Sequence, residues 1–299
     1  MRFSAPFRRE FVLLVAVVAL AHLTSAFGDD KSSSGRKDEA APDIAPPTRE
    51  DLADQRMIFI KSALAQYTIQ VGDRKEAATI SDPCLRWTNP VGGVTDGVLA
   101  VYTFEGGGRP AAVGQFFHNG PKHWINEFSI IASDNVRIMR SERLFWKPSE
   151  YICKFADLPD SPVPAAKPPL RLAQMRRIAA DFSVIDHFGW DESKITIHNL
   201  RLLPQPVFRY AEAEKILDGG LFVYALGTDP ECNLLLEAYQ DDKGARYRYA
   251  LAPMSIYQLE ARYKDTPVWG VERRIILGAR CTKYYALKYD PAPGETVPE

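Results

Sequence analysis

Two short stretches of the chain, DGVLAVYTF at 96–104 and DGGLFVYAL at 218–226, are identical at five of their nine positions. So short a match means little unless the flanking residues correspond in the same order, and here they do. The flanking landmarks differ in spacing by at most two residues, which predicts an internal repeat of roughly 120 residues and two domain-sized halves. The residues kept in both copies are Arg56/Arg176, Arg86/Arg209, Asp96/Asp218, Gly97/Gly219, Tyr102/Tyr224 and Trp146/Trp269.

Composition shifts predict where the halves begin and end. The stretch DLPDSPVPAAKPPL holds five prolines, and such a segment is typical of an extended spacer, not of a helix or an inner strand. The polar lead-in FGDDKSSSGRKDEAAPDIAPPTRE is typical of disorder. The predicted organisation is a signal peptide (1–26), a disordered linker (27–48), repeat unit 1 (49–156), a proline-rich linker (157–170), repeat unit 2 (171–290) and a disordered tail (291–299).

The first residues predict export. Arg2, Arg8 and Arg9 precede an apolar run at 11–20, and a small-residue site follows at Ala26. This is the layout of a secretory signal peptide, and the run is short for a membrane span, which needs about 20 residues. An uncleaved signal anchor is the alternative. We expect an exported protein with no transmembrane segment after cleavage, located in the periplasm, the cell envelope or the extracellular space.

Periodicity predicts the fold class. In the second half, apolar residues recur at helical spacing from Leu172 to Ile185, and a Thr48–Asp51 capping pair opens a helix in the first half. The stretches 98–104 and 221–226 are apolar on both faces and predict buried strands. The Asp-Gly pairs before them are interpreted as turns, with Gly at positive φ. We predict an α+β protein of two tandem repeated units, each an N-terminal helix packed on an antiparallel β-meander.

Charge and cysteine usage exclude several classes of protein. The 37 basic and 38 acidic residues nearly balance, which argues against a nucleic-acid partner. The chain contains no C-x-x-C, which argues against zinc and thioredoxin-like chemistry, and we expect neither a metal nor a cofactor. In an exported protein the cysteines form disulfides in one of three pairings, or they are small buried hydrophobes. The four are Cys84, Cys153, Cys232 and Cys281.

The arginines shared by the halves are the first candidate site. Arg86 lies beside Trp87 and Arg209 beside Tyr210 on apparent strands, where an Arg needs an acceptor to offset its desolvation. One interpretation is an anion or carboxylate clamp, which the planar guanidinium suits. The alternative is a structural ion pair with a strand glutamate such as Glu127 or Glu237. Trp146 and Trp269 are interpreted as core anchors, with a sugar-stacking platform as the alternative.

A second candidate site occurs once. His118, His123 and Glu127 fall within HNGPKHWINE and form a possible acid/base cluster. The spacing is not that of H-E-x-x-H, and the second half has Gln240 and Ala245 at the positions of the histidines. A nucleophile elbow, a Walker loop and a G-x-G-x-x-G motif are all missing from the sequence.

The stretches CLRWTNPVGGVTDGVLAVYTFEGGGRPAAVGQFF (84–117) and LLPQPVFRY…DGGLFVYALGTDPECNLLLEAY (202–239) resemble exported proteins of planctomycete-type bacteria. The resemblance covers most of the chain outside the leader and linkers. It implies a bacterial exported protein and implies no activity. We expect a non-catalytic binding or envelope-associated protein whose partner is a small molecule, a glycan or a protein. The alternative is an exported hydrolase or transferase that uses His118, His123 and Glu127.

Overall fold

A computed structural model describes residues 48–298 apart from 91–92, 121–122, 134, 213–214 and 274–276. The predicted signal peptide and nearly all of the first linker therefore lie outside the described residues. Elements of the first half are α1 (Arg49–Ala65), β1 (Tyr67–Val71), β2 (Thr79–Ile80), β3 (Leu85–Asn89), β4 (Val94–Thr103), β5 (Ala112–Asn119), β6 (Trp124–Ile130), β7 (Val136–Arg140) and β8 (Arg143–Trp146), followed by β9 (Ala156–Asp157).

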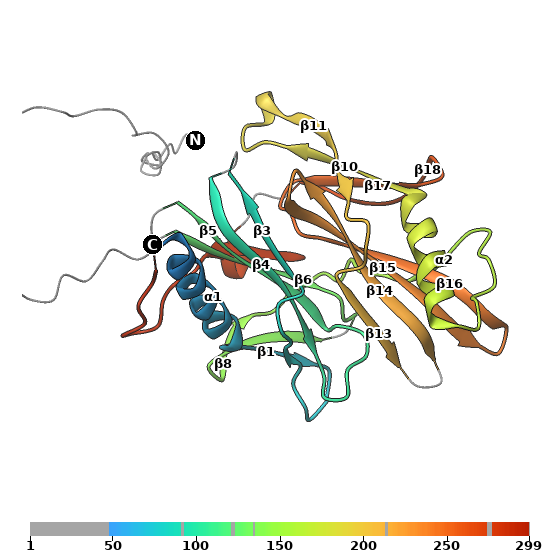
Figure 1. Ribbon diagram of the computed structural model, residues 1–299, viewed down its shortest axis with the longest axis horizontal. Coiled ribbons are helices and arrows are strands. Elements are labelled where there is room, and N and C mark those ends of the chain that lie inside the picture. The colour runs from blue at the N-terminus through green and yellow to red at the C-terminus, as the bar shows by residue number, and fades with distance from the viewer. Residues whose placement is uncertain are drawn as a thin grey trace, which may run out of the picture. The chain divides into compact units, whose positions relative to one another are not determined.

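The second half has a similar succession, a helix followed by strands, but with one additional strand, β11 (Thr196–Asn199), after its first strand (Figure 1). Its elements are α2 (Pro168–Ala180), β10 (Phe182–Phe188), β11 (Thr196–Asn199), β12 (Arg201–Leu202), β13 (Phe208–Glu212), β14 (Ile216–Leu226), β15 (Asp229–Asp241), β16 (Gly244–Pro253), β17 (Gln258–Tyr263) and β18 (Thr266–Val271), with β19 (Tyr284–Lys288) after it; 3₁₀ turns lie at Glu192–Lys194 and Gly278–Arg280.

The predicted α+β class is wrong, because strands dominate the molecule. Of the described residues, 49% lie in strands and 15% in helices, and the two α-helices accompany four antiparallel sheets. The prediction gave each helix too large a share of its unit. It also missed that each predicted meander divides between a large sheet and a small one, since a period-2 pattern shows that a strand is present but not which sheet it joins.

The two large sheets face each other. The first has the strand order β19-β6-β5-β4-β2, with β3 also paired to β4, and the second has the order β12-β14-β15-β16-β9, with β13 also paired to β14. One apolar cluster contains residues of both, including Leu99, Val113, Leu221 and Leu235. The sheets are therefore held together by a shared core, whose burial is the main stabilising contribution.

A helix and a small sheet cover the other face of each large sheet. Helix α1 and the sheet β1-β7-β8 share a core with β4, β5 and β6, and helix α2 and the sheet β11-β10-β17-β18 share one with β14, β15 and β16. The hydroxyl of Tyr102 donates to the carbonyl of Leu64 at the end of α1, and Tyr224 donates to Ala179 at the end of α2. In each half, a tyrosine of a central strand thus donates a hydrogen bond to the last turn of the helix.

The strands that follow the two halves are exchanged between the large sheets. Strand β9 follows the first half and pairs with β16 of the second large sheet, whereas β19 follows the second half and pairs with β6 of the first. Tyr285 and Tyr289 from the C-terminal segment are buried in the core beside α1. Neither large sheet is complete without a strand from beyond the opposite half.

Two predicted boundaries differ from the structure. Helix α2 begins at Pro168, inside the predicted proline-rich linker, because Pro168 and Pro169 occupy the first helical positions, where a missing N–H costs nothing. Helix α1 begins as expected, with Thr48 and Asp51 forming a reciprocal capping box. The predicted disordered tail makes defined contacts, since Glu295 accepts hydrogen bonds from Gln66 and Tyr289.

Candidate functional site

The arginines shared by the halves hold buried aspartates. Asp96 on β4 accepts from Arg86 Nε at 2.8 Å and Nη2 at 2.6 Å, and Arg56 of α1 approaches it at 3.3 Å. Asp218 on β14 accepts from Arg209 at 2.6 Å and from Arg171 of α2 at 3.3 Å. Both aspartates are buried. Each half therefore contains one carboxylate between two guanidinium groups, which ties its helix to its large sheet.

This geometry gives Arg86 and Arg209 a structural role, as the alternative interpretation proposed, but with different partners. The expected partners Glu127 and Glu237 do not contact them; Glu237 belongs to another cluster. On the helices, Arg56 corresponds to Arg171 and not to Arg176, because each of the first two lies eight residues before the carbonyl that the central tyrosine contacts. The sequence match that pairs Arg56 with Arg176 is therefore five residues away from the structural correspondence.

The aromatic residues next to these arginines, Trp87 and Tyr210, pack their rings against a glycine of the neighbouring strand. A Cβ added at Gly97 would lie 2.4 Å from the Trp87 ring, and one at Gly219 would lie 2.4 Å from the Tyr210 ring. The Asp-Gly pairs are therefore not turns at positive φ, as predicted, but interior strand residues that leave room for a cross-strand aromatic. Both rings are buried, which removes Trp87 and Tyr210 from the candidate ligand-contacting residues.

The predicted acid/base residues are not brought together. His118 packs on Trp124 with its Nδ1 2.6 Å from the Thr95 hydroxyl, and burial and the nearby Arg56 lower its pKa. Glu127 is three residues beyond Trp124 on β6, so its side chain lies on the opposite face of the sheet. It accepts from the Tyr284 hydroxyl. His123 is exposed in the connection between β5 and β6.

The remaining conserved pair of the two copies differs in burial. Trp146 pairs with Ile138 and is buried, with Nε1 donating to the carbonyl of Cys281 at 2.8 Å. Trp269 pairs with Ala261 at the equivalent place but is only partly buried at the margin of its core. Trp146 is a core anchor, and Trp269 contributes less to its own core.

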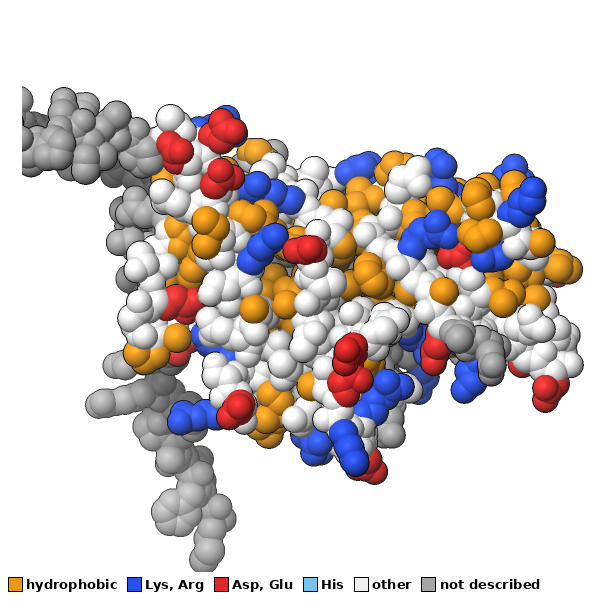
Figure 2. Space-filling view, turned by 60° about the horizontal axis from the view of Figure 1, so that its bottom comes forward, with side chains coloured by type: hydrophobic (Ala, Val, Ile, Leu, Met, Phe, Trp, Pro, Cys, Tyr) orange, Lys and Arg blue, Asp and Glu red, His pale blue; other side chains and the backbone are white. Residues whose placement is uncertain are grey.

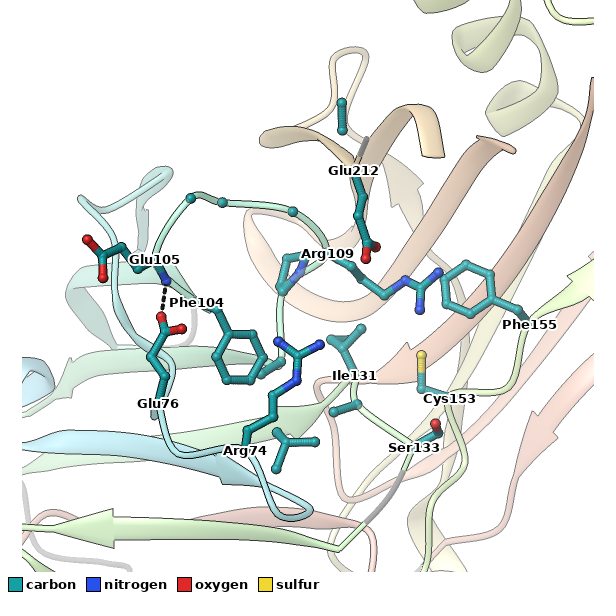
Figure 3. A pocket seen from close by; sticks show the side chains of 18 of the residues that line it. Arg74, Glu76, Phe104, Glu105, Arg109, Ile131, Ser133, Cys153, Phe155 and Glu212 are labelled. Atoms are coloured by element: carbon teal, nitrogen blue, oxygen red, sulfur yellow. Dashed lines mark hydrogen bonds between the residues drawn. The ribbon is translucent and has the colours of Figure 1, made fainter. Parts of the chain in front are cut away.

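A hollow of about 740 Å³ lies beside the hairpin that joins β4 to β5 (Figure 3). Its walls come from the loop after β1, the connection between β4 and β5, residues 131–133 after β6, and residues 153–155 with the end of β13. Its volume is in the range of small-molecule sites, about 300–1,000 Å³. We call it the Arg109 hollow; its lining includes Arg74, Phe104, Arg109, Cys153, Phe155 and Glu212.

Arg109, in the first half, is held in place by an ion pair with Glu237 of the second half. Its Nε and Nη2 donate to the two oxygens of Glu237 at 2.6 and 2.8 Å, and its guanidinium carbon lies 4.3 Å from the centre of the Phe155 ring. Glu237 is fully buried and also accepts from Tyr210 and Arg248. The bidentate pair and the ring fix the plane of Arg109, so no side-chain entropy remains to be lost there on binding a ligand.

Arg74 faces the same space from the opposite wall. Its guanidinium carbon lies 4.2 Å from the centre of the Phe104 ring, and in Figure 3 its guanidinium points into the space between the walls, whereas that of Arg109 lies against Phe155. Cys153 also lines the hollow, but burial raises the pKa of its thiol to about 12, so the thiol stays protonated and is a poor nucleophile. No disulfide joins any two of the four cysteines, all of which lie among the described residues.

The same place in the second half is closed and has the opposite charge. Pro110 and Pro230 each lie two residues before the partner of the central tyrosine, which puts Asp229 at the position of Arg109 and Glu231 at that of Ala111. The adjoining cavity, lined by Ser255 and Tyr284, measures about 30 Å³. The hollow is therefore not a necessary consequence of this strand arrangement.

Buried and half-buried carboxyl groups lie around the closed place. We call Glu127, Asp186, Asp229 and Glu231 the acid cluster. Burial raises the pKa of Glu127 to about 8 and that of Asp186 and of Asp229 to about 7, and burial together with the neighbouring carboxylates raises the pKa of Glu231. Gln115 donates to Asp229 from the first large sheet at 3.2 Å. At neutral pH Glu127 and Glu231 hold protons that ordinary carboxyls release, and Asp186 and Asp229 titrate near that pH.

Neither a metal site nor a membrane span emerges from the described residues. No three His, Cys, Asp or Glu side chains among them are placed to hold a metal ion. Within 48–298, apart from the undescribed gaps, no helix combines the length and the apolar character that crossing a bilayer requires. Basic and acidic side chains are interspersed on the face that Figure 2 shows, which does not form a patch of one sign.

No family model, curated protein or solved structure matches the chain. Its function must therefore be inferred from the residues themselves. Comparison of the copies for shared residues identified the ion clusters but missed the Arg109 hollow. The signal for the hollow was a difference between the copies, Gly-Arg-Pro at 108–110 against Thr-Asp-Pro at 228–230.

Proposed function

We propose that the chain is an exported, non-catalytic binding protein built from two copies of one unit, and that its ligand occupies the Arg109 hollow. The observation that carries this proposal is the contrast between equivalent places: one has a hollow of about 740 Å³ with Arg109 held at its wall, and the other has Asp229 at the position of Arg109 and a cavity of only about 30 Å³ beside it. Two copies of one fold have no structural need for this difference, so it indicates a specialised site.

Three further observations support binding over catalysis. His118 and Glu127 lie on opposite faces of one sheet, so the predicted acid/base cluster cannot act on one substrate atom. Burial keeps the Cys153 thiol protonated. The hollow is also built from both halves, as interdomain ligand sites commonly are. Export rests on the leader sequence at 1–26, which lies outside the described residues.

The proposal is tested by filling the hollow. Ser133 lines it and is exposed, so Ser133→Trp obstructs the space without burying a new residue in the core. Ser183→Trp on the exposed side of β10 is the matched control. A library of small metabolites is screened by thermal melting against the wild type and both variants.

A ligand present at 100 times its Kd stabilises the folded state by about 2.7 kcal/mol, which raises Tm by roughly 5 °C or more in a protein of this size. We expect at least one compound to raise the Tm of the wild type and of Ser183→Trp but not that of Ser133→Trp. If no compound discriminates the filled variant from the control, the hollow is not the binding site and the proposal fails.

A further inference from the structure

The charged groups around the Arg109 hollow define which ligand fits it. On the cationic side are Arg74, Arg109 and Lys154. Arg109 uses Nε and Nη2 for Glu237, and the stacking of Arg74 on Phe104 leaves the edge of its guanidinium for in-plane hydrogen bonds. Guanidinium edges donate in a planar fork that matches the two oxygens of a carboxylate. The cationic side therefore favours a ligand with a carboxylate.

The hollow also has acidic groups, and these exclude a ligand that is only an anion. Glu76, Glu105 and Glu212 line it. Glu76 accepts from the backbone N–H of Glu105, the contact drawn as a dashed line in Figure 3. Glu105 and Glu212 are exposed, and an ionised carboxylate only accepts hydrogen bonds. A ligand that lies against them must carry donors, either hydroxyl or ammonium groups.

Cations and carboxylates occur in equal number around the hollow, so its lining has little net charge. A polyanion would be repelled by Glu105 and Glu212, and a neutral sugar would offer Arg74 no charged partner. A single carboxylate flanked by donors satisfies both sides. In the closed place of the second half, Asp229 replaces Arg109, so a carboxylate stands where the first half has a cation.

We infer that the ligand of the Arg109 hollow is a small carboxylate that carries hydroxyl or ammonium donors, with Arg74 binding the carboxylate and Glu212 accepting from the donors. This inference rests on the proposed function, since it assigns the ligand class of the same site. Sugar acids and zwitterionic peptides share this chemistry.

The test is isothermal titration with four probes. D-glucuronate has a carboxylate and hydroxyls, glycylglycine has a carboxylate and an ammonium group, D-glucose has no carboxylate, and inorganic phosphate is an anion without a carbon skeleton. The variants are Arg74→Gln and Glu212→Gln. Arg262→Gln, at an exposed arginine of β17 that donates to the carbonyl of Asp265, is the control for loss of a surface charge.

We expect glucuronate or glycylglycine to bind, and which of the two binds more tightly identifies the source of the donors. Arg74→Gln should weaken that binding about tenfold or more, the usual loss for a hydrogen bond to a charged group, and Glu212→Gln should weaken it several-fold. Arg262→Gln should leave it unchanged.

Three outcomes overturn the inference: glucose binding as tightly as glucuronate, phosphate binding more tightly than both carboxylates, or neither carboxylate binding at 10 mM, a concentration on the order of that needed to detect millimolar affinity. If the library screen has meanwhile found a ligand that Ser133→Trp excludes, the proposed function stands and only the ligand class is wrong. If the screen finds none, the proposed function has failed on its own test.

Discussion

The buried aspartates should contribute far more to stability than any surface ion pair of the molecule. Asp96 is 1% exposed and lies between Arg56 and Arg86, whose side chains are 13% and 42% exposed. Asp96→Ala leaves two guanidinium groups facing each other, one of them mostly buried, with no carboxylate between them. Removing one partner of a buried ion pair typically costs about 3–5 kcal/mol, a large share of the roughly 5–15 kcal/mol by which a domain is stable.

The assay is urea unfolding followed by tryptophan fluorescence and far-ultraviolet circular dichroism. Arg86→Ala should lose less than Asp96→Ala, because Arg56 still pairs with the carboxylate. Asp241→Ala is the control, since Asp241 pairs with Arg246 at the surface, where such a pair contributes about 0–1 kcal/mol. Should Asp96→Ala lose no more than Asp241→Ala, the ion clusters do not hold the helices to the sheets and our structural account of Arg86 and Arg209 is refuted.

Three further predictions concern packing, protonation and the exchanged strand. Gly97→Ala forces a Cβ into the Trp87 ring and should lower the free energy of unfolding in urea by about 1–3 kcal/mol. In the control Gly270→Ala the added Cβ meets only ordinary contacts, so the loss of stability should be smaller. Equal losses in the two variants would contradict the inference that Gly97 makes room for Trp87. Burial raises the pKa of Glu127 in the folded state to about 8, against an ordinary value of 4.5, so the stability that its proton confers is complete below about pH 4.5 and is lost as pH rises through 8. Between these values the free energy of unfolding should fall by about 1.4 kcal/mol per pH unit for this one proton. Glu127→Gln should therefore flatten the dependence of the unfolding free energy on pH between pH 5 and 8. Tyr285→Ala, in the exchanged strand β19, should destabilise the core beside α1 by about 3–5 kcal/mol, and an unchanged urea midpoint would show that β19 is dispensable.

The exchange of β9 and β19 has a consequence for how the halves fold. The core beside α1 includes Tyr285 and Tyr289 from the chain terminus, and the core beside α2 includes Leu158 from the connection between the halves. Each half thus depends on residues beyond the other or between the two. We expect cooperative unfolding of the described region in one transition, because neither half completes its core from its own residues.

The local features of the fold could be predicted from the residues alone. These features are the Thr48–Asp51 capping box, the buried strands around Tyr102 and Tyr224, and the alternation on β6. Each depends on residue types at fixed short spacings, and the geometry of the local backbone relates such spacings directly to structure. The sequence also brought Arg86, Asp96 and Gly97 to attention as residues with a counterpart in the other half. It could not say that Arg86 binds Asp96, or that Gly97 accommodates Trp87, because these are cross-strand contacts set by register.

The fold class, the exchange of β9 and β19 and the Arg109 hollow depend on contacts between residues far apart in the sequence. The predicted α+β class failed because strand patterns do not state which sheet a strand enters, and β9 and β19 enter the sheets of the opposite halves. Arg109 and Glu237 are far apart in the chain and meet only because the two large sheets face each other. Local propensity acts over a few residues, whereas the free energy that places these groups comes from burying the shared core, which depends on the whole fold.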